Sequence, residues 1–295
     1  MNIGIYGGTF DPPHAGHVAA AQAAMEALHL DKLLLIPDAQ PPHKQLPQGS
    51  ATPQQRYDMT VLATASLGKL AEVSDMELRR AGVSYTADTL AALRAQYPED
   101  TLYLLMGSDM FLSLHTWRRP EDIVALAHIA PFSRETEDES AAFDAQKAYL
   151  EQHFAAQVTV IPNPQVVEVS STEIRARLAR GQGGELLPPP VWGYIQRERL
   201  YGTRTDLTHL TPEALRPIAL SYLKPKRMPH VLGTEMPWPS RRMPFRPMWA
   251  ISTTCCRNWI STGPMPGPSC VPRRAASSWW PATCWASACT ARTSS

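Results

Sequence analysis

The stretch Ile3–His17, IGIYGGTFDPPHAGH, decides the fold of this 295-residue chain. It begins with the apolar residues of a short buried strand and continues into two adjacent glycines and an Asp-Pro-Pro corner. From Gly16 to Leu30 the sequence is Ala-rich and unbroken, which predicts a helix. A glycine loop between a strand and a helix N-terminus is where α/β proteins bind phosphate, because backbone N–H groups and the helix dipole favour an anion there.

Two histidines, His14 and His17, stand three residues apart at the predicted helix start, so both can face one pocket. Each could donate a hydrogen bond to a phosphoryl oxygen. The alternative is a pair of capping or packing histidines, which the glycines in front make less favourable. The stretch is neither a Walker loop nor a Gly-x-Gly-x-x-Gly dinucleotide turn. The other residues expected at the phosphate site in this loop are Gly7, Gly8, Thr9 and Phe10.

Strands and helices alternate along the chain, which predicts a right-handed, Rossmann-like parallel α/β sheet with helices on both faces. The strands expected after the first are Lys32–Pro37, Leu70–Val73, Glu77–Arg80, Thr101–Met106, His128–Phe132 and Val158–Ile161. The helices expected after the first are Pro53–Leu67, Thr86–Tyr97, Ser140–Phe154 and Leu207–Leu223, the last with Pro212 following a possible Thr211 cap.

A second cluster follows the strand at Thr101–Met106 and consists of Gly107, Asp109 and the later Trp117. The carboxyl end of such a strand is a ligand-binding edge of an open sheet. Asp109 could accept hydrogen bonds from ribose hydroxyls, and Trp117 could stack on a flat heterocycle. A helix-capping aspartate and a core tryptophan are the structural alternatives.

The third cluster is the stretch 169–175, VSSTEIR. Its hydroxyls, followed by Glu173, are typical of a capping box. The same residues also bring hydroxyls, free N–H groups and an arginine to one helix start, where a phosphate would bind. Both interpretations can hold together. The phosphate-binding residues predicted here are Ser170, Ser171, Thr172 and Arg175.

Together, GGTFDPPHAGH, Gly-Ser-Asp with its later Trp, and VSSTEIR resemble the bacterial nicotinate-nucleotide adenylyltransferase family, whose His-x-Gly-His motif handles the α-phosphate of ATP. The resemblance runs from residue 1 to about 202, where Leu200-Tyr201 is similar to the family's usual end. It implies the nucleotidyltransferase fold, and it implies that His17 contacts the α-phosphate and His14 the bridging and β-phosphate oxygens. By the same resemblance Asp109 holds the adenosine ribose and Trp117 stacks on the nicotinate ring.

The acceptor side implied by the resemblance contains Lys44, Thr86 and Arg134, each of which alone is more typical of a solvated surface. Lys44 and Arg134 would face the mononucleotide or the polyphosphate, and Thr86 the nicotinate carboxylate. The family commonly has Pro-Gly after that arginine, whereas Glu135-Thr136 stands here, which weakens the transfer to Arg134.

The implied reaction joins ATP to nicotinate mononucleotide, giving deamido-NAD and pyrophosphate. Mg²⁺ is expected with ATP, and no metal site formed by the protein is predicted. A preference for nicotinamide mononucleotide is the nearest alternative. Enzymes of this fold also transfer AMP or CMP to phosphopantetheine or glycerol phosphate, which Trp117 and the Gly-Ser-Asp spacing disfavour. A catalytically inactive nucleotide-binding module, disfavoured by the intact histidine pair, is an alternative of another class.

Composition narrows the class further. The net charge of +1 gives no overall case for nucleic acid, and no run of about 18 apolar residues suggests a membrane span. The N-terminus lacks a basic region before an apolar segment, and the first 254 residues contain no cysteine, so a cytoplasmic enzyme without disulfides is expected. The sequence leaves the oligomeric state open.

Beyond residue 202 the sequence changes character. Residues 203–235 resemble the start of an HD-type phosphohydrolase, with Arg227 and His230 in an Arg-x-x-His pattern, but no Asp occurs after Asp206 to complete a metal site. Residues 236–295 contain seven Arg, no Asp, Glu or Lys, and all five Cys; without those Arg the net charge of residues 1–235 is −6. We expect a largely irregular, frameshifted tail there, and an Arg- and Trp-containing arm for nucleic acid is the alternative.

Overall fold

The computed structural model describes residues 1–41, 45–80, 82–133, 137–162, 170–224, 227–228 and 230–231, which all belong to one compact unit, Met1–Pro237. Within these residues a six-stranded sheet has the order β3-β2-β1-β4-β5-β6, and every neighbouring pair is parallel. The strands are β1 (Asn2–Gly8), β2 (Lys32–Pro37), β3 (Ala71–Val73), β4 (Thr101–Met106), β5 (His128–Ser133) and β6 (Ile161–Pro162). The predicted parallel α/β sheet is confirmed.

The strand order turns at β1, which lies between β2 and β4. The chain adds β2 and β3 on one side of β1 and then β4, β5 and β6 on the other side. A crevice forms between the carboxyl ends of β1 and β4, where the order reverses. Both the glycine loop of Ile3–His17 and the Gly-Ser-Asp cluster follow these two strands. The topology thus brings two of the three predicted clusters to one edge of the sheet.

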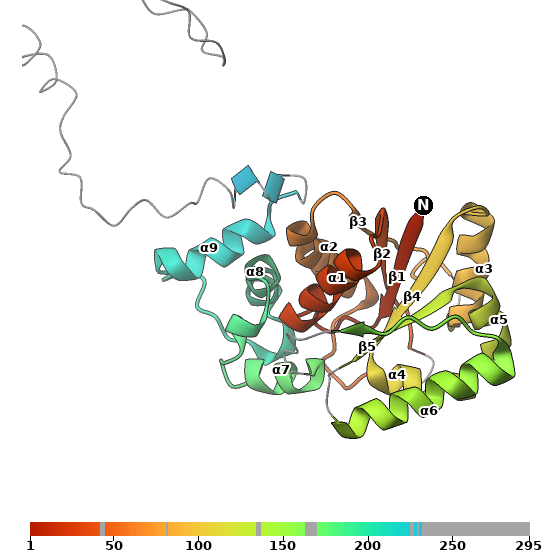
Figure 1. Cartoon of the computed structure of the whole chain (residues 1–295). Coiled ribbons are helices and arrows are strands. Elements are labelled where there is room, and N and C mark those ends of the chain that lie inside the picture. The colour runs from red at the N-terminus through yellow and green to blue at the C-terminus, as the bar shows by residue number, and fades with distance from the viewer. Residues whose placement is uncertain are drawn as a thin grey trace, which may run out of the picture. The chain divides into compact units, whose positions relative to one another are not determined.

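Helices cover both faces of the sheet, as Figure 1 shows with α1 on one side and α3 and α5 on the other. One face packs Ile3, Ile5 and Leu104 against apolar residues of α3 to α6. The other face packs Leu33 and Leu35 against the alanines of α1. The described helices are α1 (Ala15–Ala27), α2 (Pro53–Thr64), α3 (Thr86–Gln96), α4 (Ser108–Ser113), α5 (Pro120–Leu126), α6 (Glu137–Phe154), α7 (Ser171–Leu178), α8 (Pro189–Glu198) and α9 (Pro212–Ser221).

One predicted strand is wrong. Glu77–Arg80 forms a turn in which the Arg80 N–H donates to the Glu77 carbonyl at 3.2 Å. Its polar side chains are engaged locally, because the Glu77 carboxylate accepts a hydrogen bond from Thr89 at the start of α3. Two short helices, α4 and α5, were not expected from the sequence, and β6 is shorter than the predicted Val158–Ile161, with Val158 forming an isolated bridge to Ile129.

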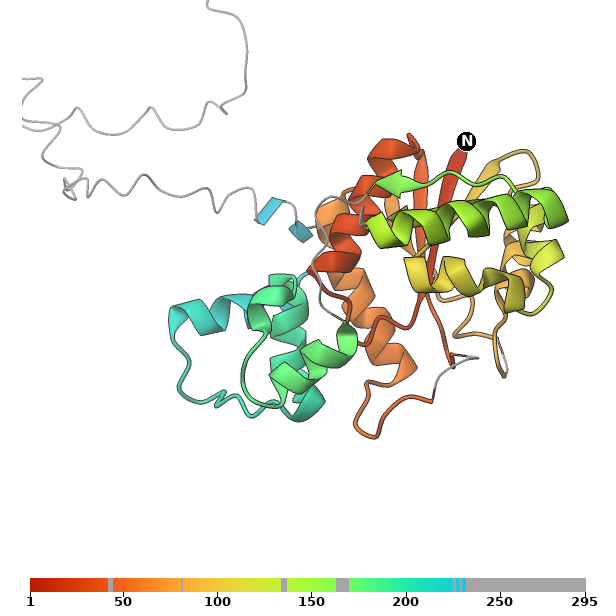
Figure 2. The same ribbon diagram turned by 60° about the horizontal axis from the view of Figure 1, so that its bottom comes forward.

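A third apolar cluster joins α2, α7, α8 and the residues after Gly202. The predicted helix near Leu207–Leu223 is confirmed as α9, and Thr211 caps it by accepting a hydrogen bond from the Ala214 N–H. Helix α9 crosses α8 so closely that a Cβ on Gly193 would lie 1.9 Å from the Pro217 carbonyl oxygen. Figure 2 shows α7, α8 and α9 side by side.

Packing therefore continues past residue 202, and Met228 is fully buried in the third cluster. The interpretation of residues 203–235 as the start of an HD-type domain stays a prediction. The hypothesis of a frameshifted, irregular tail at 236–295 concerns residues outside those described. Among the helices of the described segments, none is long and apolar enough to cross a membrane.

Candidate functional site

The two histidines meet at the N-terminus of α1, with their ring centroids 3.8 Å apart. The His14 backbone N–H donates a hydrogen bond to His17 Nδ1 over 3.2 Å. Because Nδ1 of His17 accepts this bond, the proton of the neutral ring belongs on Nε2, where it can be donated to a ligand oxygen. The ring of Phe10 contacts the His17 ring edge-on, with centroids 5.2 Å apart, and further restricts its orientation.

Both histidines are neutral near pH 7. Burial lowers the pKa of His14 to about 4. Burial also lowers the pKa of His17 well below its usual range, with the neighbouring His14 as a second cause. The Nδ1 atom of His14 is buried without a hydrogen-bond partner among the described residues. The pair therefore offers neutral N–H donors and one unpaired polar atom at the end of β1, as a site for phosphoryl oxygens requires.

This burial predicts a pH-dependent stability. An unfolded histidine has a pKa of about 6.5, so between that value and pH 4 the unfolded chain binds a proton at His14 that the folded chain does not. Stability should be complete above pH 6.5 and fall as the pH drops toward 4. Melting temperatures measured over this range should fall less steeply for His14→Gln than for the unmodified chain. The same slope in both proteins would contradict the assignment, and His153→Gln, at an exposed histidine, is the control.

The glycine loop is shaped by close packing on one side and open space on the other. A Cβ on Gly8 would lie 3.2 Å from the ring of Phe10, so a larger residue there would require this ring to shift slightly. A Cβ on Gly7 would meet nothing within 4 Å. Phe10 itself is buried, has a φ of 49° and packs its ring edge-on against Tyr6 of β1, and its contact with ATP stays a prediction. The Thr9 hydroxyl donates to Asp38 over 2.8 Å.

Arg56 of α2 holds this loop in place and was not predicted from the sequence. It is fully buried and donates from Nη1 to the Thr9 carbonyl at 2.7 Å and to Asp38 Oδ1 at 2.9 Å. Its Nη2 donates to the Ala39 carbonyl at 3.0 Å. The guanidinium thus ties the end of β1 to the end of β2. No local signal distinguishes such an arginine from a solvated one in an amphipathic helix.

The third predicted cluster lies against the first. The Ser171 hydroxyl donates to the Pro12 carbonyl at 3.1 Å, and Arg175 Nη1 donates to the Asp11 carbonyl at 2.7 Å. Arg175 Nη2 also donates to the Thr172 hydroxyl at 3.1 Å. The start of α7 is therefore docked on the loop that carries the histidines, as a shared phosphate site requires.

The capping interpretation of this cluster is half confirmed. Ser170 caps α7, because its hydroxyl accepts a hydrogen bond from the Glu173 N–H at 3.1 Å. The Glu173 carboxylate pairs with Arg177 one turn further along, and no reciprocal bond closes a capping box. Cap and anion site remain compatible, since Ser170 uses only one N–H of the first turn.

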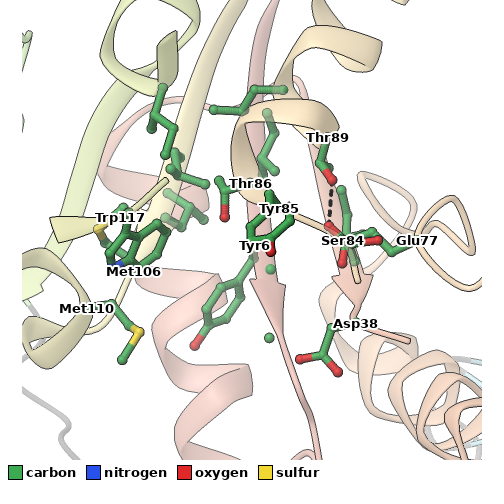
Figure 3. A pocket seen from close by; sticks show the side chains of 18 of the residues that line it. Tyr6, Asp38, Glu77, Ser84, Tyr85, Thr86, Thr89, Met106, Met110 and Trp117 are labelled. Atoms are coloured by element: carbon green, nitrogen blue, oxygen red, sulfur yellow. Dashed lines mark hydrogen bonds between the residues drawn. The ribbon is translucent and has the colours of Figure 1, made fainter. Parts of the chain in front are cut away.

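A cavity of about 390 Å³ opens at the carboxyl ends of β1 and β4. Gly7, Gly8 and Gly107 form part of its wall, so it adjoins the histidine loop. Figure 3 shows Trp117 with Met106 and Met110 at one end, Thr86 in the middle, and Asp38 and Glu77 at the other end. The volume and the mixture of aromatic and polar walls suit a small ligand with a flat ring.

The remaining predicted residues do not line the cavity in the described part of the chain. Asp109 lies exposed in the first turn of α4, beside the cavity wall formed by Gly107 and Met110, and is not itself a lining residue. Lys44 and Arg134 lie outside the described residues. Several polar lining residues were not predicted, among them Glu77, whose pKa is raised by burial, and Ser84, whose buried hydroxyl has no hydrogen-bond partner among the described residues. Glu77 carries no recognisable sequence signal, whereas Ser84 stands two residues before the predicted Thr86.

A search of the described residues finds no group of three or more His, Cys, Asp or Glu side chains placed to hold a metal ion.

Comparisons with known proteins identify the family that this chain resembles. The family model described as cytidylyltransferase-like matches residues 5–177. The probable nicotinate-nucleotide adenylyltransferase of Dictyoglomus thermophilum is 40% identical over 202 residues, which cover 68% of this chain and 100% of the relative. The protein of the same name from Idiomarina loihiensis is 36% identical over 207 residues, covering 67% of this chain and 98% of the relative.

A solved structure shares the fold. The Plasmodium falciparum nicotinic acid mononucleotide adenylyltransferase complexed with NaAD superposes with a TM-score of 0.55 at 19% identity, covering 70% of this chain and 99% of its own. In each comparison, about two thirds of the present chain corresponds to nearly the whole of the similar protein.

Proposed function

The chain belongs to the nicotinate-nucleotide adenylyltransferase family, and on that premise we propose that it transfers AMP from ATP to nicotinate mononucleotide, releasing deamido-NAD and pyrophosphate. The observation that carries the proposal is the pair of neutral histidines at the end of β1, next to a cavity that ends at Trp117 beyond β4. This arrangement offers a phosphate site and a site for a flat ring on one edge of the sheet.

In the reaction, a 5′-phosphate oxygen of the acceptor attacks the α-phosphorus of ATP, and the bond from that phosphorus to the bridging oxygen breaks. The acceptor phosphate is already anionic near pH 7, so no general base is needed. The protein contributes positioning and stabilisation of developing charge. We assign His17 to the α-phosphate, through its Nε2–H, and His14 to the bridging and β-phosphate oxygens.

The start of α7 is proposed to hold the β- and γ-phosphates. Its first-turn N–H groups, the hydroxyls of Ser171 and Thr172, and the Arg175 guanidinium lie together against the histidine loop. A helix N-terminus combined with an arginine suits an anion with several oxygens. Lys44 and Arg134 are proposed as further cations near the phosphates, on the family resemblance alone. Mg²⁺ is proposed to arrive bound to the ATP phosphates, whose charge it would neutralise.

The cavity is proposed to take the nicotinate ring, stacked on Trp117, with its carboxylate at the start of α3. Thr86 is the first residue of that helix, and the preceding Tyr85 provides no side-chain cap. The first N–H groups of α3 and the Thr86 hydroxyl are therefore suited to a carboxylate. Asp109, near the mouth of the cavity, is proposed to hold the adenosine ribose. A cytoplasmic location is proposed because the first 254 residues contain no cysteine for a disulfide.

The acceptor preference tests this assignment. With Mg-ATP, pyrophosphate release should show a kcat/KM about tenfold or more higher for nicotinate mononucleotide than for nicotinamide mononucleotide, on the scale of a hydrogen bond to a charged group. Thr86→Val should narrow this preference. Thr116→Val, at an exposed threonine outside the cavity, is the control and should not. Equal or better use of the amide would show that the start of α3 does not select the carboxylate.

A further inference from the structure

The loop that carries the histidines contains a buried carboxylate, Asp11. Asp11 is 2% exposed, and its Oδ1 accepts hydrogen bonds from the Tyr201 hydroxyl at 2.7 Å and from the Ala51 N–H at 3.1 Å. Its Oδ2 has no hydrogen-bond partner among the described residues and lies 3.6 Å from Arg175 Nη1. The same Nη1 donates to the Asp11 backbone carbonyl. Asp11 therefore links the loop to the arginine that is proposed to bind ATP.

Tyr201 reaches this carboxylate from the far end of the family-like region. It lies in the short 3-10 turn Leu200–Gly202 that follows α8, and its side chain is buried in the third apolar cluster. Burial, followed by the charge of Asp11, raises the pKa of the Tyr201 phenol, so its hydroxyl is always a donor near neutral pH. A donor at this place matters, because a buried carboxylate that lacks partners is costly.

We propose that Tyr201 is a positioning residue for ATP: its hydroxyl holds the Asp11 carboxylate in the one orientation that attracts and fixes the Arg175 guanidinium. The inference rests on the proposed function, in which Arg175 binds the β- and γ-phosphates. Ser171, which is bonded to the Pro12 carbonyl, docks the helix start by a separate contact. Loss of the Tyr201 hydroxyl should therefore loosen the arginine while α7 stays in place.

Tyr201→Phe keeps the buried ring and removes only the donor. The KM for ATP should rise about tenfold, the scale of one hydrogen bond to a charged group, while the KM for nicotinate mononucleotide stays unchanged. Tyr194→Phe is a matched control, because Tyr194 is equally buried in the same cluster and also donates to a carboxylate, Asp58, at 3.2 Å. Asp58 does not contact the loop in any described interaction, and both KM values should keep their original size.

A double-mutant cycle separates positioning from mere structural support. In an Arg175→Ala background, Tyr201→Phe should raise the KM for ATP no further, because the group it positions is gone. An additive effect, or an unchanged KM for ATP in the single variant, would overturn the inference. If Tyr201→Phe fails to fold, Asp11→Asn tests the same contacts, since it keeps an acceptor for Tyr201 and removes the charge that attracts Arg175. The KM for ATP should then rise, and an unchanged KM for ATP would overturn the inference.

Equilibrium binding of ATP to the full chain distinguishes a failure of the proposed reaction from a failure of the positioning role of Tyr201. If the unmodified chain binds ATP and Tyr201→Phe weakens that binding while neither protein makes product, the proposed reaction fails and the positioning role stands. If the unmodified chain turns over normally and ATP binding is equal in both proteins, the positioning role fails and the reaction stands.

Discussion

Replacing His17 by alanine should lower kcat by about 10² or more, on the scale of removing one preorganised donor from developing transition-state charge. The His17 ring is held by the backbone N–H of His14 and by Phe10, so its Nε2–H is fixed before substrate arrives. The proposed contact with the α-phosphate should strengthen as that group becomes pentacoordinate. Because most ATP contacts remain, the KM for ATP should change little. Steady-state kinetics with saturating acceptor would measure both constants.

Two comparisons make the His17 result specific. His17→Gln keeps an N–H donor at about the distance of Nε2 from the backbone and should recover part of the lost rate. His153→Ala removes an exposed histidine of α6 that stacks on Tyr149, and should leave kcat unchanged. A folded His17→Ala protein with a near-normal kcat would remove His17 from the chemical step.

Arg56→Met should destabilise the fold by about 3–5 kcal/mol, the range observed when one partner of a buried ion pair is removed. Methionine fills much of the same volume but supplies no donors. The Asp38 carboxylate and the carbonyls of Thr9 and Ala39 would lose their bonds to the guanidinium. Since these groups sit at the ends of β1 and β2, the histidine loop should loosen as well. Urea denaturation followed by circular dichroism would give the change in the free energy of unfolding.

Arg79→Met provides the matched control. Arg79 pairs with Asp75 across one turn, but its side chain is 78% exposed. Exposed pairs of this kind contribute little to stability, because water and salt screen them. The control should therefore unfold at nearly the original urea concentration. Equal losses in the two variants would mean that Arg56 has no special structural role.

The sequence predicts the sheet well where strand residues are buried on both faces. KLLLIP in β2 and TLYLLM in β4 are unbroken apolar runs, and their observed bounds match the expected ones. The prediction failed at Glu77–Arg80, a stretch with a single apolar residue, whose Glu77 carboxylate and Arg80 guanidinium both bond to Thr89 of α3. Local pattern cannot reveal a partner twelve residues away.

The site residues also differ in whether a local sequence pattern predicts them. The histidines, Ser171 and Arg175 belong to contiguous motifs, so the sequence identifies them and the structure brings them together. Arg56 and Tyr201 are single residues whose meaning depends on a partner 18 to 190 positions away. Only the folded chain shows that both anchor the loop that carries the histidines. The predicted roles of Lys44 and Arg134 stay predictions.

The proposed transfer of AMP to nicotinate mononucleotide is most directly tested by identifying the products. The purified full chain would be incubated with Mg-ATP and nicotinate mononucleotide, and the products separated by chromatography and identified by mass spectrometry. We expect deamido-NAD and pyrophosphate to appear in equal amounts, and both to be lost in His17→Ala. Release of ADP or inorganic phosphate without a dinucleotide, or no consumption of ATP by the folded protein, would contradict the account.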